Sequence, residues 1–199
     1  MLASLAFVVA AYLIGSVSFA VVTSKLFGLP DPHSYGSGNP GATNVLRTGH
    51  KAAAALTLAG DGAKGWLAVF LAQMLGPAFG VADWVVPAVA LAVFVGHLFP
   101  VFHHFAGGKG VATAAGILFA FSWPLVLSLA VVWLVMAYGF KISSLAALTV
   151  AALAPIGAFY VFGNAPAAWI WIPISALLFW RHRTNIRQLL EGRERPIGR

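Results

Sequence analysis

Long stretches without a charged residue alternate with short polar segments along this chain. A helix needs about 20 mostly apolar residues to cross a bilayer, and several of these stretches approach or exceed that length. Five of them are uncharged throughout: Leu2–Val22, Trp84–Phe102, Val111–Phe140, Ser143–Phe162 and Ala165–Trp180. A sixth, Ala52–Leu75, is apolar except for Asp61 and Lys64. The pattern predicts a series of membrane-spanning helices.

Two of these stretches need closer inspection. No basic residue precedes Leu2–Val22 and no clear cleavage site follows it, which favours a retained helix over a signal peptide. Val111–Phe140 is too long for a single crossing at about 1.5 Å per residue. Ser122, Trp123 and Pro124 interrupt it near the middle, so we expect two short crossings there and seven helices in total.

Composition excludes an ordinary soluble domain. Of 199 residues, 60% are hydrophobic and 9% are charged, whereas soluble domains carry about 25% charged residues. No internal repeat or linker is visible, so we expect one membrane domain over residues 1–199. The chain has no cysteine, which excludes disulfides, thiolate nucleophiles and thiolate metal ligands.

The basic residues support the count of seven. With seven crossings, no Lys or Arg falls in the loops on one side of the membrane, where the charged residue is Asp83. The other side receives Lys25, Arg47, Lys51, Lys109, Lys141, Arg181, Arg183, Arg187, Arg193, Arg195 and Arg199. The positive-inside rule then predicts an all-α membrane protein with its N-terminus outside and its C-terminus in the cytoplasm. The net charge of +7 is therefore an orientation signal and gives no support for nucleic-acid binding.

Both glycine-rich segments fall in loops on the predicted cytoplasmic side. Glycines let backbone N–H groups crowd around a phosphate, and a nearby cation adds charge. The segment Gly36–Arg47 carries the polar side chains of Ser37, Asn39, Thr43, Asn44 and Arg47. We interpret it as a polar cradle for a phosphorylated substrate; the alternative is a turn before a helix capped by Thr43 or Asn44.

The second glycine-rich segment, Gly107–Gly110, carries Lys109 and precedes an apolar run. A phosphate could rest on the amides of the following helix, with Lys109 as its counter-charge. The alternative is a flexible turn whose lysine only serves orientation.

Other polar residues admit more than one interpretation. Asp61 and Lys64 lie three apart within a span, so they share one helix face and are either functional or a self-neutralising structural pair. The three histidines beside the second glycine-rich segment, at positions 97, 103 and 104, have no carboxylate nearby in sequence, so we expect no metal site. After the last apolar stretch, Ile186, Leu189 and Leu190 share one face of a short amphipathic helix. His182 and Asn185 lie in the same segment.

These segments together resemble the bacterial acyl-phosphate:glycerol-3-phosphate acyltransferase (PlsY) family. The resemblance runs in order through nearly the whole chain. It is carried by Gly36–Arg47, by Asp61 with Lys64, by Gly96–Phe102 with Gly107–Thr113, and by Arg181–Ile186 with Gly192 and Glu194.

The resemblance implies transfer of a fatty acyl group from acyl phosphate to the 1-hydroxyl of glycerol 3-phosphate, at the cytoplasmic side of the bacterial inner membrane and without a cofactor. It assigns catalysis to Ser37, Arg47, Lys109, His182 and Asn185. It assigns substrate binding to Gly36, Ser37, Gly38, Asn39, Gly41, Thr43, Asn44, Arg47, Gly107, Gly108, Lys109, Gly110 and Ser144. Asp61, Lys64 and Glu194 are expected to be structural.

The remaining alternatives concern chemistry. A carrier for a phosphorylated metabolite would also bind anions at broken helices, but the chain shows no inverted repeat. An acyltransferase that uses acyl-CoA is disfavoured because no His is followed five positions later by Asp.

Acyl phosphate is already activated, so we expect direct transfer without an acyl-enzyme. The proton of the attacking hydroxyl would pass either to His182 or to the phosphate of the donor.

Overall fold

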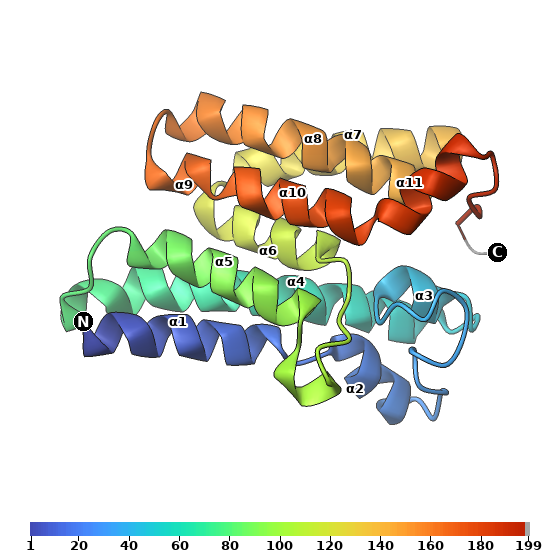
Figure 1. Cartoon of the computed structure of the whole chain (residues 1–199), viewed down its shortest axis with the longest axis horizontal. Helices are drawn as coiled ribbons and strands as arrows, with labels where there is room; N and C mark the ends of the chain where they lie inside the picture. Colours follow the sequence, from blue (N-terminus) through green and yellow to red (C-terminus); the bar gives the residue numbers. More distant parts are fainter. Residues whose placement is uncertain (198–199) are drawn as a thin grey trace. The chain divides into compact units, whose positions relative to one another are not determined.

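The structure is a computed structural model that describes residues 1–197, so the predicted basic residue Arg199 lies outside the described residues. Over that range every regular element is a helix (Figure 1). The chain divides into two compact units, Met1–Phe121 and Ser122–Arg199.

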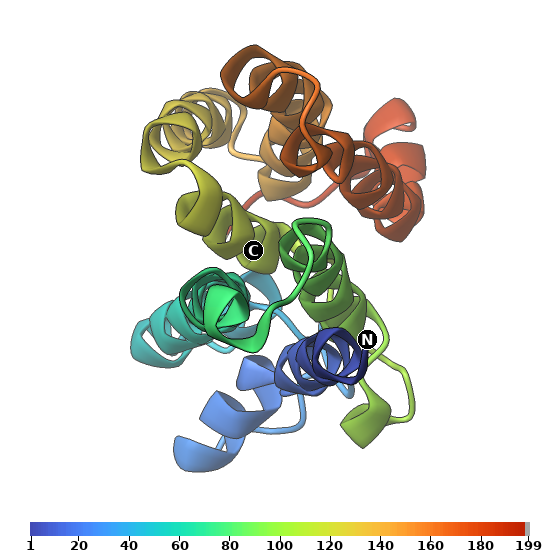
Figure 2. The same cartoon turned by 90° about the vertical axis from the view of Figure 1, so that its left-hand side faces the viewer.

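The first unit is built on three long helices and several shorter ones. Its elements are α1 (Leu2–Gly15), α2 (Phe19–Leu26), α3 (Ala42–Leu46), α4 (Lys51–Leu75), the 3-10 turn η1 (Gly76–Phe79), α5 (Val85–Leu98), the 3-10 turn η2 (Val101–His103) and α6 (Val111–Phe121). α1 packs on α5, and α4 packs on both α5 and α6. Figure 2 shows these helices nearly end on.

Glycine contacts let the helices of the first unit approach closely. A Cβ on Gly116 of α6 would overlap the carbonyl of Gly62 on α4. A Cβ on Gly96 of α5 would likewise overlap the carbonyl of Tyr12 on α1. Small residues at helix contacts are typical of membrane proteins, where association depends on close van der Waals packing.

The expected single helix over Leu2–Val22 is wrong, because α1 and α2 are separated by a break and differ in direction by 42°. The carbonyl of Val17 accepts a hydrogen bond from Lys64 Nζ at 2.7 Å instead of continuing the helix ladder. Ser18 then begins α2, with its Oγ accepting from the N–H of Val21 at 3.5 Å. Ser16 Oγ accepts from the N–H of Val101 at 3.3 Å.

The second unit consists of α7 (Trp123–Phe140), α8 (Ser143–Phe162), α9 (Pro166–Trp169), α10 (Trp171–Arg181) and α11 (Arg183–Leu190). α8 packs on α7, α9 and α10. The predicted break in Val111–Phe140 is confirmed: Ser122 is the N-cap of α7, and its Oγ accepts from the N–H of Leu125. The expected single stretch Ala165–Trp180 is divided at Ile170 into α9 and α10. The short helix predicted after the last apolar stretch is present as α11.

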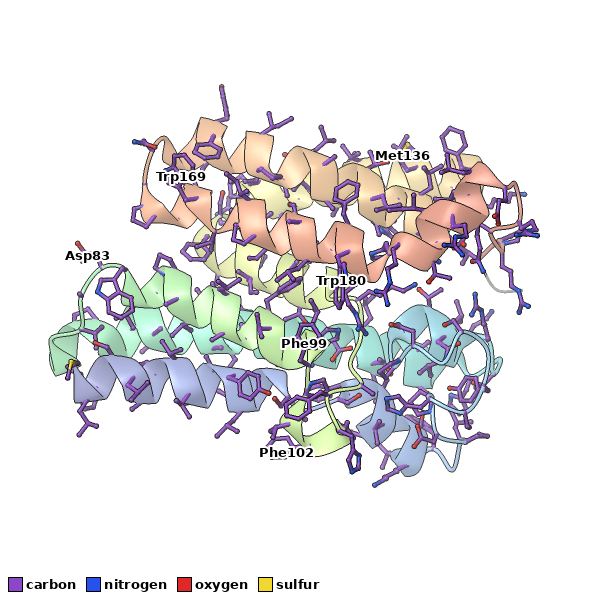
Figure 3. All side chains as sticks on the ribbon, in the orientation of Figure 1. Asp83, Phe99, Phe102, Met136, Trp169 and Trp180 are labelled. Atoms are coloured by element: carbon purple, nitrogen blue, oxygen red, sulfur yellow. The ribbon has the colours of Figure 1, made fainter. Side chains whose placement is uncertain are left out.

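Several helices have the length and composition to cross a membrane. Within residues 1–197 these are Val85–His103, Trp123–Phe140 and Ser143–Phe162, and the bent pair α1 and α2 adds a fourth if it counts as one span. Large apolar side chains also project outward along the helices (Figure 3). Val131 on α7 and Tyr160 on α8, for example, are 59% and 91% exposed, as expected for helices that face lipid.

Candidate active site

Asn44 is the hub of the first glycine-rich segment. Its Nδ2 donates to the carbonyls of Pro32 at 2.9 Å and Tyr35 at 3.2 Å. Its Oδ1 accepts from the backbone N–H of Ser37 at 2.9 Å, from Ser37 Oγ at 3.2 Å and from an Arg47 guanidinium nitrogen at 3.3 Å. The buried amide, only 2% exposed, therefore fixes the positions of Ser37 and Arg47 relative to each other.

Gly36 is required beside this hub. Its φ is +61°, a conformation that other residues adopt at a cost, and a Cβ there would overlap Asn44 Oδ1. The short helix α3 that follows begins at Gly41, its N-cap. The alternative of a cap by Thr43 or Asn44 is therefore wrong, since both residues lie inside α3. Thr43 is exposed and Asn39 is partly exposed.

The second glycine-rich segment rests on the end of α5. The N–H of Gly108 donates to the carbonyl of His97 at 3.1 Å, and a Cβ on Gly108 would overlap the His97 ring. Gly110, at φ +90°, turns the chain into α6. Lys109 is partly exposed and lies two residues before the first residue of that helix. N–H groups at a helix start and an adjacent cation are the two components of an anion site.

A buried cluster of ionisable side chains lies beside the Gly107–Gly110 segment. Asp61 Oδ1 lies 2.8 Å from Lys64 Nζ and 3.5 Å from His97 Nδ1, and the side chains of these three residues are at most 7% exposed. Lys64 also holds the carbonyl of Val17, and the carbonyl of Asp61 accepts from Thr113 Oγ1 at 3.0 Å. The cluster thus ties α4 to the α1–α2 break, to α5 and to the start of α6.

A small hollow lies beside the cluster. Its lining includes Ser16, Ser18, Pro40, Lys64, His97 and Gly108. Pro40 belongs to the first glycine-rich segment and Gly108 to the second, so the two segments approach each other at the hollow. The first unit therefore brings the segment of Ser37 and Arg47 close to the segment of Lys109.

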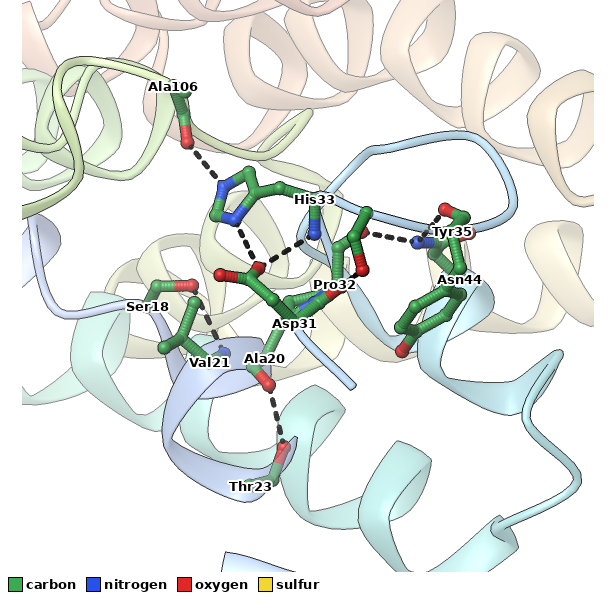
Figure 4. A network of polar contacts seen from close by, with 11 residues as sticks. Ser18, Ala20, Val21, Thr23, Asp31, Pro32, His33, Tyr35, Asn44 and Ala106 are labelled. Carbon is green, nitrogen blue, oxygen red and sulfur yellow. Dashed lines mark hydrogen bonds and ion pairs between the residues drawn. The ribbon is translucent and has the colours of Figure 1, made fainter. Parts of the chain in front are cut away.

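Figure 4 shows a second contact between the two glycine-rich regions, from His33 to Ala106, the residue before Gly107. His33 Nδ1 lies 2.7 Å from Asp31 Oδ1, and His33 Nε2 lies 3.0 Å from the carbonyl of Ala106. The backbone N–H of His33, which donates to Asp31 at 2.9 Å, is the main cause that lowers the pKa of that carboxyl, and the ring of His33 lowers it further. Asp31 is therefore ionised at neutral pH.

In the second unit, Glu194 joins two of the predicted site residues. Its Oε1 accepts from Ser144 Oγ at 2.6 Å and from Asn185 Nδ2 at 2.7 Å. These contacts fasten the tail to the starts of α8 and α11. One carboxylate oxygen of Glu194 therefore holds both Ser144 and Asn185.

His182 lies between α10 and α11 and is 3% exposed. Its Nδ1 lies 2.8 Å from the carbonyl of Leu178. Because a carbonyl only accepts, this Nδ1 carries a proton, and the neutral ring has its lone pair on Nε2. That tautomer suits a base or a hydrogen-bond acceptor. Within residues 1–197, no group of three or more His, Cys, Asp or Glu side chains has the geometry to hold a metal ion.

The glycerol-3-phosphate acyltransferase family matches residues 5–192 of the chain. The chain belongs to this family. The glycerol-3-phosphate acyltransferase of Cupriavidus taiwanensis is 62% identical over 197 residues, which cover 99% of this chain and 98% of that protein. The one from Neisseria meningitidis serogroup B is 56% identical over 191 residues, which cover 96% of each chain.

Solved structures agree with the sequence relatives. The chain is similar to the crystal structure of PlsY (YgiH), an integral membrane glycerol 3-phosphate acyltransferase, in its glycerol 3-phosphate form. The TM-score is 0.89 at 40% identity, covering 98% of this chain and 96% of that one. The lysophosphatidic acid form of PlsY gives 0.87 at 39% identity, covering 98% and 95%. The resemblance inferred from the motifs is thereby confirmed.

The contacts of two histidines in the candidate site were not predicted from the sequence. His33 was not considered, although an Asp two residues before a polar side chain is a signal for a local turn in which the carboxylate accepts a backbone N–H. His97 was considered as a metal ligand and as part of the Gly96–Phe102 segment of the resemblance, but no contact was predicted for it. Its contacts to Gly108 and Asp61 come from residues distant in sequence, and no local pattern announces them.

Proposed function

We propose that this protein transfers a fatty acyl group from acyl phosphate to the 1-hydroxyl of glycerol 3-phosphate. The products are 1-acyl-glycerol 3-phosphate and inorganic phosphate. The observation that carries the proposal is the similarity, over 98% of the chain, to a structure of PlsY in its glycerol 3-phosphate form. Two further observations support it. Asn44 orders Ser37 and Arg47, and the Gly107–Gly110 segment, which carries Lys109, is held against the end of α5. Both segments thus offer hydrogen-bond donors and positive charge to substrates that carry phosphate.

Ser37, Arg47 and Lys109 are the groups we assign to the phosphates. Arg47 has a planar fork of donors that suits two phosphate oxygens, and Lys109 adds a point charge next to the amides of α6. Asn44 is occupied by five hydrogen bonds within its segment, so its role is to hold Ser37 and Arg47 in position. The glycines of both segments allow the substrate to approach the backbone.

His182 and Asn185 are assigned to catalysis, and Ser144 is assigned to substrate binding. Glu194 holds Ser144 and Asn185 through one carboxylate oxygen, and His182 is oriented by its bond to Leu178. Groups fixed in this way lose little freedom when substrate binds, which is how an enzyme brings a hydroxyl and a carbonyl together.

The step itself needs no covalent enzyme intermediate. The 1-hydroxyl oxygen attacks the acyl carbonyl, the bond from carbonyl carbon to phosphate oxygen breaks, and phosphate leaves. The hydroxyl proton passes to the departing phosphate, or to Nε2 of His182. We favour the phosphate because it already lies beside the carbonyl and requires no additional base.

A comparison of donors tests the reaction. Purified protein is given glycerol 3-phosphate with acyl phosphate, acyl-CoA or acyl carrier protein, and 1-acyl-glycerol 3-phosphate is measured. We expect product with acyl phosphate alone. Product from acyl-CoA at a similar rate contradicts the proposed donor, and no product from any donor contradicts the proposed activity and favours a carrier.

A second experiment tests direct transfer. The protein is incubated with acyl phosphate in the absence of glycerol 3-phosphate, quenched, and weighed intact by mass spectrometry. We expect the mass of the unmodified chain. A stoichiometric acyl adduct on Ser37 or Thr43, formed and consumed at the rate of turnover, would show that the enzyme uses a covalent intermediate.

The proposed setting is the bacterial inner membrane. Seven spans, an external N-terminus and a cytoplasmic C-terminus place every Lys and Arg outside the spans, Lys64 excepted, on the cytoplasmic side. The water-soluble substrate and the lipid substrate would then meet where the polar loops border the bilayer.

A further inference from the structure

His33 bridges the chain on either side of the proposed phosphate site. One ring nitrogen lies 2.7 Å from Asp31 Oδ1, and the other lies 3.0 Å from the carbonyl of Ala106, the residue before Gly107. His33 itself lies three residues before Gly36, at the entrance to the first glycine-rich segment. The bridge is therefore a polar contact that helps to set the separation of the two segments.

The two contacts together determine the protons of the ring. The carbonyl of Ala106 only accepts, so Nε2 must carry a hydrogen. The ionised carboxylate of Asp31 also only accepts, so Nδ1 must carry one as well. A histidine that satisfies both partners is consequently the imidazolium cation. The neutral ring keeps one hydrogen and loses one of the two contacts.

The bridge connects the groups assigned to phosphate. Asn44 holds Ser37 and Arg47 through Oδ1, and through Nδ2 it holds carbonyls on both sides of His33, at positions 32 and 35. On the other side, Ala106 is three residues before Lys109. We propose that protonated His33 is a positioning residue that fixes the Lys109 segment relative to Ser37 and Arg47.

The surroundings of His33 allow it to act in this way. Its side chain is 29% exposed and that of Asp31 is 60% exposed, so both are accessible to protons from solvent. The ring of His103 has its centre 6.3 Å away. The ionised carboxylate of Asp31 favours the charge of the imidazolium.

A spectroscopic measurement tests the bridge without relying on activity. Because the chain has no cysteine, spin labels can be placed uniquely at Ser34→Cys and Ala106→Cys in the full-length protein. The distance between the two labels is measured first in the protein that retains His33. We expect a narrow distance distribution.

Two variants in the labelled background make this result decisive. His33→Ala should give a broader distance distribution, and His33→Arg, whose guanidinium can donate to both partners, should give the narrow one. If His33→Ala and the labelled protein that retains His33 give the same distribution, the proposal is overturned.

A kinetic measurement connects the bridge to turnover and rests on the proposed function. His33→Ala should raise the KM for glycerol 3-phosphate roughly three- to tenfold, the value of about one net hydrogen bond, while kcat changes by less than about twofold. His33→Arg should restore the KM. His104→Asn is the matched control, because His104 is an exposed histidine two residues before Ala106, at φ +50°, and asparagine tolerates that conformation.

The outcomes are distinguishable. An unchanged KM in His33→Ala, or an equal rise in His104→Asn, contradicts the positioning role even if the protein is active. Absence of acyltransferase activity in the unsubstituted protein contradicts the proposed function, while the spin-label result still decides whether the bridge exists.

Discussion

Among single residues, Lys109 gives the most direct test of the proposed phosphate site. A hydrogen bond to a charged partner is worth about 1.5–3 kcal/mol, so Lys109→Ala should lower kcat/KM by at least about tenfold. Lys51→Ala is the matched control, since Lys51 is an exposed lysine at the start of α4 and belongs to no motif. Near-normal kinetics in folded Lys109→Ala would reduce the second glycine-rich segment to a turn.

Asn44 offers a different residue-scale test. Asn44→Ala removes the partner of Ser37 and Arg47 and takes away the donor to the carbonyl of Pro32. Each buried group left unsatisfied costs about 1–3 kcal/mol, so we expect both a lower thermal midpoint and a large loss of kcat/KM. Asn164→Ala is the control, because the Asn164 amide oxygen accepts an exposed hydrogen bond from Trp169 Nε1. Equal effects of the two substitutions would contradict the role of Asn44 in holding Ser37 and Arg47.

At this scale the sequence predicted a polar substrate-binding segment but not the contacts within it. Asn44 was predicted to orient substrate from its place in a polar, glycine-rich segment. Its buried position and its contacts depend on how residues 32–37 fold back over α3, and no local periodicity encodes that path. For the same reason His33 and His97 were not recognised.

At the scale of elements, the close packing of α6 on α4 can be tested with glycine substitutions. Gly116→Ala would place a Cβ against the carbonyl of Gly62, and overpacking of this kind costs about 1–3 kcal/mol. Gly139→Ala on α7 meets no atom within 4 Å and should be neutral or slightly stabilising, because alanine favours helix over glycine by up to about 1 kcal/mol. The thermal midpoints of the two purified variants are compared. Equal midpoints would contradict the close packing of α6 on α4.

Helix breaks show why some elements were predictable and others were not. The break at Ser122 was predicted because Val111–Phe140 is too long for one crossing and Ser122, Trp123 and Pro124 interrupt it. The break after Gly15 was missed because the apolar run continues through it. It depends on Lys64, 47 positions away in sequence, which takes the carbonyl of Val17. The residues around Gly15 cannot indicate a hydrogen bond whose donor is so distant in the sequence.

At the scale of the whole molecule, the orientation of the chain is open to direct test. Single cysteines at Asn164 and Arg195 should react with a membrane-impermeant reagent from opposite sides, the first from outside. The reason is the segregation of Lys and Arg outside the spans to one side. Cells and inside-out vesicles serve as mutual controls. Labelling of both positions from the same side would contradict seven spans.

The short helix α6 has a consequence for the membrane itself. Its 11 residues rise only about 16 Å, roughly half of the hydrocarbon thickness of about 30 Å. In the proposed topology at least one of its ends, and therefore either the Lys109 segment or the Ser122 turn, lies below the lipid headgroups. Such a mismatch is relieved where the bilayer is locally thin. Turnover in vesicles should consequently depend on the chain length of the surrounding lipids, and lipids of short chain should favour it.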